Sequence, residues 1–95
     1  MASLKQTAFA LSVLTNLNSN GFSSQLLDNT IAALFDWMID FYISPNFSEQ
    51  PGLYQVDQAT IAWLYSALIN LNETGGSKPI WYDDFFARVR GAISQ

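Results

Sequence analysis

The chain has 95 residues, a length that predicts a single domain over residues 1–95. It contains no cysteine, which excludes disulfides and thiolate metal sites, and no histidine, which removes the commonest general base and the commonest metal ligand. Eight acidic and four basic residues give a formal charge of −4, and so few bases cannot neutralise a nucleic-acid backbone, so we expect no nucleic-acid partner.

The first predicted helix covers about residues 3–17. Ser3 and Gln6 have the spacing of a capping box, and Gly21 can adopt the left-handed conformation that ends a helix. Because polar residues interrupt this stretch and no small-residue cleavage site follows it, we expect a helix of the mature protein and no signal peptide. Its apolar arc comprises Phe9, Ala10, Leu11, Val13, Leu14 and Leu17, and its polar face comprises Lys5, Ser12, Thr15 and Asn16.

The second predicted helix covers about residues 23–43, with Ser23 or Ser24 as its cap. Most of its circumference is apolar, which indicates a central helix or one with a second contact surface. Its acidic residues make membrane insertion costly, so we expect a soluble protein without a transmembrane helix. The narrow polar stripe of this helix comprises Gln25, Asn29, Asp36 and Asp40.

A long irregular connection over 44–56 is predicted to lead to a third helix over about 57–71, with Asp57 as its cap. Trp63 and Tyr65 lie between its strongly apolar face and a row of small or polar residues. Such a row lets the backbone of another helix approach closely. The row comprises Ala59, Ala62, Ser66 and Asn70.

The fourth predicted helix covers about 79–93, and Pro79 suits its first turn. It is amphipathic, with aromatic residues on one half and Asp83, Asp84, Arg88 and Arg90 on the other. Asp84 and Arg88 are four residues apart and can pair across one turn.

The sequence therefore predicts an all-α domain, a small bundle of four main helices with an irregular 44–56 connection. No stretch alternates as an exposed strand would. The predicted core comprises Leu14, Leu34, Phe35, Leu64, Leu68, Phe85 and Val89.

No residue pattern indicates catalysis. Asp36 and Asp40 form the best-placed carboxylate pair, but a wet helix face gives no reason for their pKa values to separate into an acid and a base. A hard cation would need four or more oxygen ligands beyond these two. Phosphate-binding loops, dinucleotide fingerprints and nucleophile elbows do not occur. We expect no enzyme, no metal site and no cofactor.

Charged residues make up 13% of the chain and aromatic residues 15%, and a surface with so little charge is poorly protected against association. The favoured function is a non-enzymatic protein–protein interaction or assembly module. We expect it to form a homo-oligomer, to lie in the cytoplasm or in a virion, and to serve as a component of a larger, virion- or phage-like assembly. The predicted interface comprises Asp36, Trp37, Asp40, Ala59, Ala62, Trp63, Ser66, Asn70, Arg88 and Arg90.

Contact between the acidic stripe of one copy and Arg88 and Arg90 of another would build a ring or filament, or a dimer if it were reciprocal. The alternative function is a small acidic inhibitor or immunity-type protein that blocks a basic partner through Asp36, Asp40 and Trp37. The low density of acids weakens this alternative, because electrostatic steering needs a concentrated field. A third hypothesis is a small apolar ligand held between aromatic-rich helices.

Overall fold

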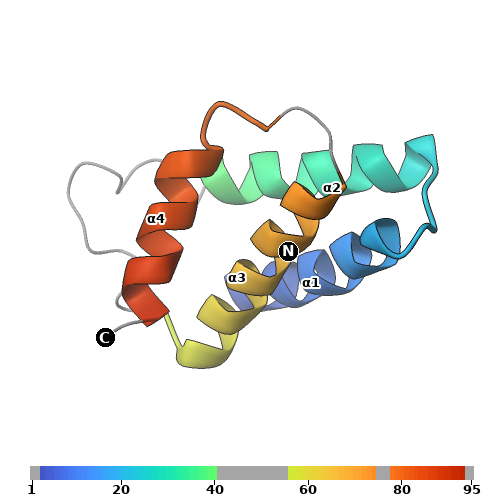
Figure 1. Cartoon of the computed structure of the whole chain (residues 1–95). Helices are drawn as coiled ribbons and strands as arrows, with labels where there is room; N and C mark the ends of the chain where they lie inside the picture. Colours follow the sequence, from blue (N-terminus) through green and yellow to red (C-terminus); the bar gives the residue numbers. More distant parts are fainter. Residues whose placement is uncertain (1–2, 41–55, 75–77, 94–95) are drawn as a thin grey trace.

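A computed structural model of the chain describes residues 3–40, 56–74 and 78–93 (Figure 1). These residues form four helices: α1 (Leu4–Ser19), α2 (Gln25–Met38), α3 (Gln58–Glu73) and α4 (Tyr82–Ile93). No strand occurs in the described ranges, and the prediction of an all-α, four-helix fold is confirmed. None of the described helices has both the length and the apolar character that crossing a membrane requires.

Side-chain caps begin three of the helices. The Ser3 hydroxyl accepts a hydrogen bond from the Gln6 amide at 3.1 Å, and the Gln6 side chain accepts one from the Ser3 amide at 3.0 Å, so the predicted capping box is present. Ser24 and Asp57 likewise accept from backbone N–H groups three residues later, at 3.1 and 2.8 Å. Each cap satisfies a donor that the first turn of a helix leaves unpaired.

α2 ends as an α-helix at Met38 and continues as a π-helical turn over residues 39 and 40, and its predicted end at residue 43 lies outside the described ranges. The start of α4 differs clearly from its predicted place. α4 begins at Tyr82 rather than at Pro79, because the chain first makes a turn in which the Tyr82 amide donates to the Pro79 carbonyl at 3.0 Å. The fixed φ of proline suits such a turn as well as a helix. Apart from Val56, the predicted 44–56 connection also lies outside the described residues.

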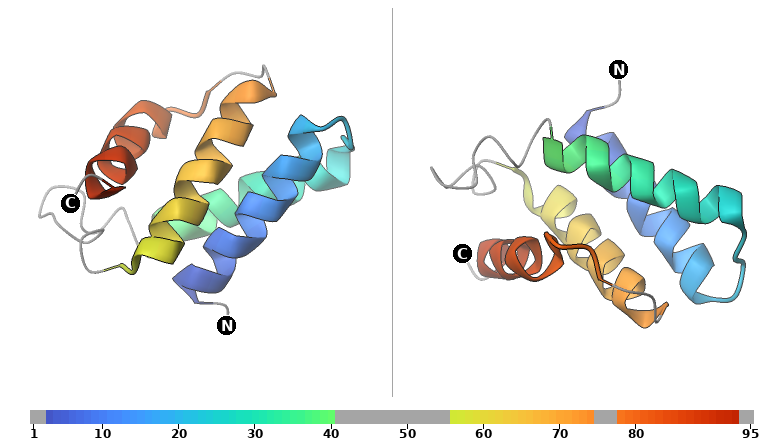
Figure 2. Two further views of the ribbon diagram at one scale, coloured as in Figure 1. Left: turned by 60° about the horizontal axis from the view of Figure 1, so that its bottom comes forward. Right: turned by 90° about the horizontal axis from the view of Figure 1, so that it is seen from above.

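Helices α1 and α3 lie side by side and run in the same direction (Figure 2, left). α2 crosses behind this pair, and α4 lies on the opposite side of α3 from α1. α3 is therefore the central helix, packed against both α1 and α4. The contacts that join α1 to α3 occur in the same order along both helices: Lys5 to Asp57, Phe9 to Trp63, and Thr15 to Asn70.

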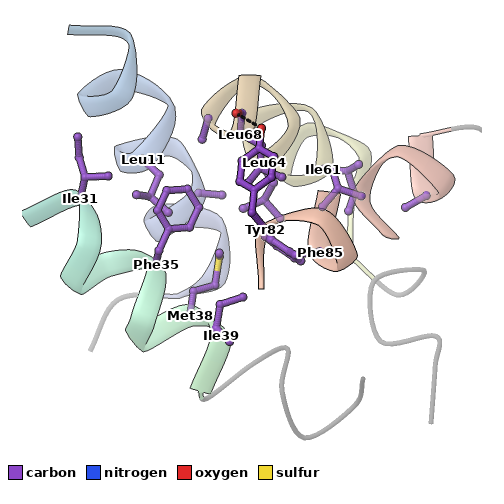
Figure 3. Packing of buried hydrophobic residues seen from close by; sticks show 14 residues of the cluster. Leu11, Ile31, Phe35, Met38, Ile39, Ile61, Leu64, Leu68, Tyr82 and Phe85 are labelled. Atoms are coloured by element: carbon purple, nitrogen blue, oxygen red, sulfur yellow. Dashed lines mark hydrogen bonds between the residues drawn. The ribbon is translucent and has the colours of Figure 1, made fainter. Parts of the chain in front are cut away.

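One hydrophobic core lies where the four helices meet (Figure 3). Five of the seven predicted core residues are buried, and the other two, Leu14 and Leu34, are half-buried and pack against the edge of the core. The buried hydrophobic residues are Ala8, Leu11, Ile31, Phe35, Met38, Ile39, Ile61, Leu64, Ala67, Leu68, Tyr82, Phe85, Val89 and Ala92.

α1 turns a different side to the core from the one predicted. Thr15, predicted on the polar face, is 1% exposed, and Thr7 is also buried. Burial of Thr15 is tolerated because its hydroxyl donates to the Leu11 carbonyl at 2.6 Å and accepts from the Asn70 side-chain amide at 3.3 Å. A threonine whose hydroxyl is paired in this way packs as a small apolar residue would.

Candidate functional site

The side of α1 and α3 that points away from α2 is open in the described part of the chain (Figure 2, left). We call this side the outer face. On α1, Phe9 packs against Trp63 of α3, and Val13 and Leu17 follow it at intervals of four residues, so these three side chains form one row along the helix, which we include in the outer face. Their side chains are 51%, 43% and 41% exposed, although the sequence placed all three in the apolar arc of α1. Contiguous exposed apolar side chains of this size are typical of interaction surfaces.

On α3 the outer face carries the predicted row of small residues. Ala59, Ala62 and Ser66 are all exposed. Trp63 is half-buried beside them and meets the edge of the Phe9 ring of α1, with 5.0 Å between ring centroids and 63° between ring planes. The outer face therefore presents a row of large apolar side chains on one helix and a row of small ones on its neighbour.

Asn70, the last residue of the predicted small row, is directed toward α1. It is half-buried, and its side-chain amide donates to the Thr15 hydroxyl at 3.3 Å. This hydrogen bond joins α1 to α3.

The charged groups at one end of the outer face neutralise each other. Lys5 Nζ lies 3.3 Å from Asp57 Oδ2, with both side chains about half exposed. Hydrogen bonds from the side chain and the backbone of Thr60 lower the pKa of Asp57 to about 2, and the Lys5 ammonium adds to this effect. The carboxylate is thus charged at neutral pH, and the pair gives the face no net charge.

The predicted interface residues of α2 lie elsewhere. Asp36 and Asp40 are exposed, as are Gln25 and Asn29 of the same polar stripe. Trp37 is half-buried and packs against the core. The structure therefore does not bring the acidic stripe and the small row of α3 together on one surface.

The two predicted interface arginines both interact within α4. Arg88 Nε lies 3.2 Å from Asp84 Oδ2, which is the pair expected from the four-residue spacing, and its side chain is only 24% exposed. The Arg90 guanidinium lies 5.2 Å from the centroid of the Phe86 ring. An acidic surface of another copy would have to compete with these existing contacts.

A separate feature is a cavity of about 420 Å³ between α2, the end of α3 and residues 78–82. Its volume falls within the range of small-molecule sites, roughly 300–1,000 Å³. Phe35 of α2 and Trp81 form part of the wall, with their ring centroids 5.1 Å apart, and Tyr82 lies beside them. Asp28 and Asp36 of α2 and Lys78 supply the charged groups of the lining.

Two of the charged groups of the cavity already have partners. Asp28 accepts a hydrogen bond from the Asn18 side chain at 3.2 Å. Lys78 Nζ lies 3.9 Å from Asp83 Oδ1 and 5.2 Å from the centroid of the Tyr82 ring. Burial raises the pKa of the Tyr82 hydroxyl, and the nearby Asp83 carboxylate adds to this.

The side chains of this cavity do not form a metal centre. In residues 3–40, 56–74 and 78–93, no three Asp or Glu side chains come together in a way that would hold an ion. Asp36 and Asp40 remain two carboxylates on one exposed stretch, with no described group that would separate their roles.

Sequence reasoning missed the large row of the outer face and the walls of the cavity. The sequence did hold a signal for the exposed row of α1. A second face of this helix, made of smaller residues, recurs at helical spacing and could face the core in its place: Thr7, Ala8, Leu11 and Thr15. The cavity has no comparable signal, because it depends on how far residues 78–82 stand from α2.

Comparison with known proteins finds no relative of this chain. No protein-family model matches it, and neither a curated protein nor a solved structure does. What the chain does is therefore inferred from its own surfaces.

Proposed function

We propose that this protein is a non-enzymatic interaction module that associates with further copies of itself through the outer face of α1 and α3. The observation that carries the proposal is that Phe9, Val13 and Leu17, spaced four residues apart on α1, are all 41–51% exposed in the described part of the chain. Removing these side chains from water would stabilise a complex by the hydrophobic effect, which is proportional to the apolar area buried.

The two rows of the outer face favour a second copy as the partner. If two copies meet about a twofold axis, the same face is used twice, and each residue pair occurs twice. The large row of α1 in one copy can then lie against the small row of Ala59, Ala62 and Ser66 in the other, and the reverse contact forms at the same time. Large side chains entering a groove of small ones is how helices pack closely.

The charges of the outer face also favour a second copy of the chain as the partner. Because Lys5 and Asp57 pair with each other at 3.3 Å, the face presents no excess charge that would select a strongly acidic or strongly basic protein. Association through this face should therefore persist at high salt, since salt mainly screens exposed charges.

The test is the molar mass by light scattering over a hundredfold range of protein concentration, at low and at high salt. The mass of the chain is 10.6 kDa, and we expect a concentration-dependent rise toward twice this value. Val13→Glu should abolish the rise, because it would bury an unpaired carboxylate in the contact. Its own fold should not change, since Val13 is 43% exposed.

Ile80→Glu is the matched control. It introduces the same charge at a fully exposed apolar residue that lies in the turn before α4 and is not part of the outer face. This variant should associate as the parent chain does. A mass of one chain at every concentration would show that the proposal is wrong, and loss of association in Ile80→Glu but not in Val13→Glu would assign it to another face.

A larger, virion- or phage-like assembly would need a second contact, because a twofold contact closes on itself as a dimer. The exposed acidic residues of α2 are a candidate surface for such a contact. They are also what supports the alternative function, an inhibitor that blocks a basic partner through Asp36 and Asp40. This alternative has weaker support, because Lys78 lines the same cavity as Asp36 and reduces the negative field there.

A further inference from the structure

We propose that the cavity between α2 and residues 78–82 binds an organic cation, a protonated amine carried on an apolar body. This proposal goes beyond the self-association proposed above, since none of the outer-face residues lines the cavity. It depends on the shape of the cavity, on the chemistry of its wall and on the balance of its charges.

The wall of the cavity is apolar and therefore suits a ligand with an apolar body. Ile31 is 3% exposed, and Phe35 and Tyr82 are each 2% exposed, so the wall is built from side chains fixed in the core. The tyrosine hydroxyl is not available to a ligand, because it donates to the Leu68 carbonyl at 2.6 Å (Figure 3). These residues form an apolar floor, and the half-buried Trp81 beside Phe35 presents more of its ring, which an aromatic or branched aliphatic body can contact.

The charges of the lining favour a cation. Asp28 is held by Asn18, and Lys78 lies near Asp83. The carboxylate of Asp36 has no hydrogen-bond or ion-pair partner in the described ranges, and it belongs to the residue next to Phe35 in α2. An ammonium group beside Asp36 would pair with that carboxylate, and the aromatic rings of the wall would attract it further through their negative faces.

An anionic ligand fits less well. Lys78 could meet its charge only in competition with Asp83, at 3.9 Å, and with the ring of Tyr82, at 5.2 Å. An anion in the cavity would also lie near both Asp28 and Asp36, which repel it. A neutral apolar ligand would leave the Asp36 carboxylate unpaired.

Three probes of nearly equal size and different charge test the proposal: 4-phenylbutylamine, 4-phenylbutanol and 4-phenylbutyrate. Each is titrated into the full ¹⁵N-labelled chain, and binding is followed by the shifts of amide resonances. We expect the amine to shift the amides of Asp36, Lys78 and Trp81. We also expect it to bind about threefold more tightly than the alcohol, the size of an exposed ion pair, with the butyrate binding weakest.

Asp36→Asn should remove the preference for the amine over the alcohol, because it keeps the shape of the side chain without its charge. Asp40→Asn is the matched control, since Asp40 is an exposed aspartate four residues along the chain and does not line the cavity. It should keep the preference. Both side chains are exposed, so neither variant should change the fold, and the amide spectrum itself shows this.

Three results would overturn the proposal: tightest binding of the butyrate, shifts confined to the outer face around Val13, or an unchanged preference in Asp36→Asn. The same titration of the Val13→Glu variant separates the two proposals. Amine binding there without self-association is the result expected if both proposals hold. In the parent chain, amine preference without self-association would support the cavity alone, and self-association without amine preference would support the outer face alone.

Discussion

The hydroxyl of Tyr82 donates a hydrogen bond to the backbone carbonyl of Leu68 over 2.6 Å, inside the core. This bond fixes the first turn of α4 to the last part of α3, and a carbonyl oxygen has a second lone pair for the hydrogen bond of its own helix. We expect Tyr82→Phe to lower the free energy of unfolding by about 1 kcal/mol. Urea denaturation measures this difference, and a variant as stable as the parent would show that the bond contributes nothing.

The stability of the protein should fall at alkaline pH through the same residue. Burial, with a contribution from Asp83, raises the pKa of Tyr82, so the folded state keeps a proton that the unfolded chain releases. The stability that comes from this proton is fully present below the unfolded tyrosine pKa of about 10. It is lost as the pH rises from there through the higher pKa of the folded state. Tyr82→Phe should reduce the alkaline loss. Tyr65→Phe is the control, because it removes a half-buried tyrosine elsewhere in the bundle.

Two buried threonines of α1 should respond in opposite directions to replacement by valine. The Thr7 hydroxyl is buried without a hydrogen-bond partner among the described residues, so Thr7→Val should raise the free energy of unfolding by about 1 kcal/mol. Thr15→Val should lower it by a similar amount, because the amide of Asn70 loses its acceptor. Thermal or urea unfolding of the two variants tests this. An equal loss of unfolding free energy in both would contradict the conclusion that the Thr7 hydroxyl is buried without a hydrogen-bond partner among the described residues.

Two glycines should also differ in sign when replaced by alanine. Gly21 follows α1 with a φ of +96°, and an alanine there would be strained although a Cβ would meet no other atom. Gly21→Ala should therefore cost about 1 kcal/mol. Gly91 lies within α4 with open space at its Cβ position, so Gly91→Ala should stabilise the protein by about 0.5–1 kcal/mol. Chemical denaturation of both variants is the measurement, and the same sign in both would contradict the prediction.

Acid should weaken the start of α3. Thr60, followed by Lys5, lowers the pKa of Asp57 to about 2, so the charged cap contributes stability above the unfolded pKa of about 4. That contribution is lost as the pH falls toward 2. Asp57→Asn keeps an acceptor at the cap but does not titrate. The variant should therefore lose less stability than the parent between pH 4 and 2, as followed by thermal unfolding, and parallel curves would contradict the lowered pKa.

The elements that the sequence predicted well have local signals. The caps at Ser3 with Gln6 and at Asp57 form their hydrogen bonds within one helical turn. The helix starts that they predict therefore do not depend on the rest of the chain. The start of α4 was predicted less well, because Pro79 fits a turn and a helix equally, and the contacts of Tyr82 decide between them.

The orientation of α1 could not be predicted from hydropathy alone. Both of its sides hold enough small or apolar residues to face a core, and Thr15 counts as polar until the Leu11 carbonyl and Asn70 are known to pair with its hydroxyl. The small row of α3 was identified from the sequence, whereas the large row of α1 beside it was recognised only as part of a broad apolar arc. The outer face and the cavity are tertiary features, since each is assembled from separate helices.

The parallel pairing of α1 with α3 also constrains how the chain folds. Thr15 and Asn70 are 55 residues apart, and a parallel pair requires the chain to return along the whole length of the helix before it can dock. Contacts of such long range form only after the intervening chain has closed into a loop, which costs conformational entropy. During synthesis, α1 leaves the ribosome well before α3, and Leu11 and Ala8 then have no α3 to cover them. In a nascent chain of this protein, the apolar side of α1 therefore stays uncovered until α3 has been made.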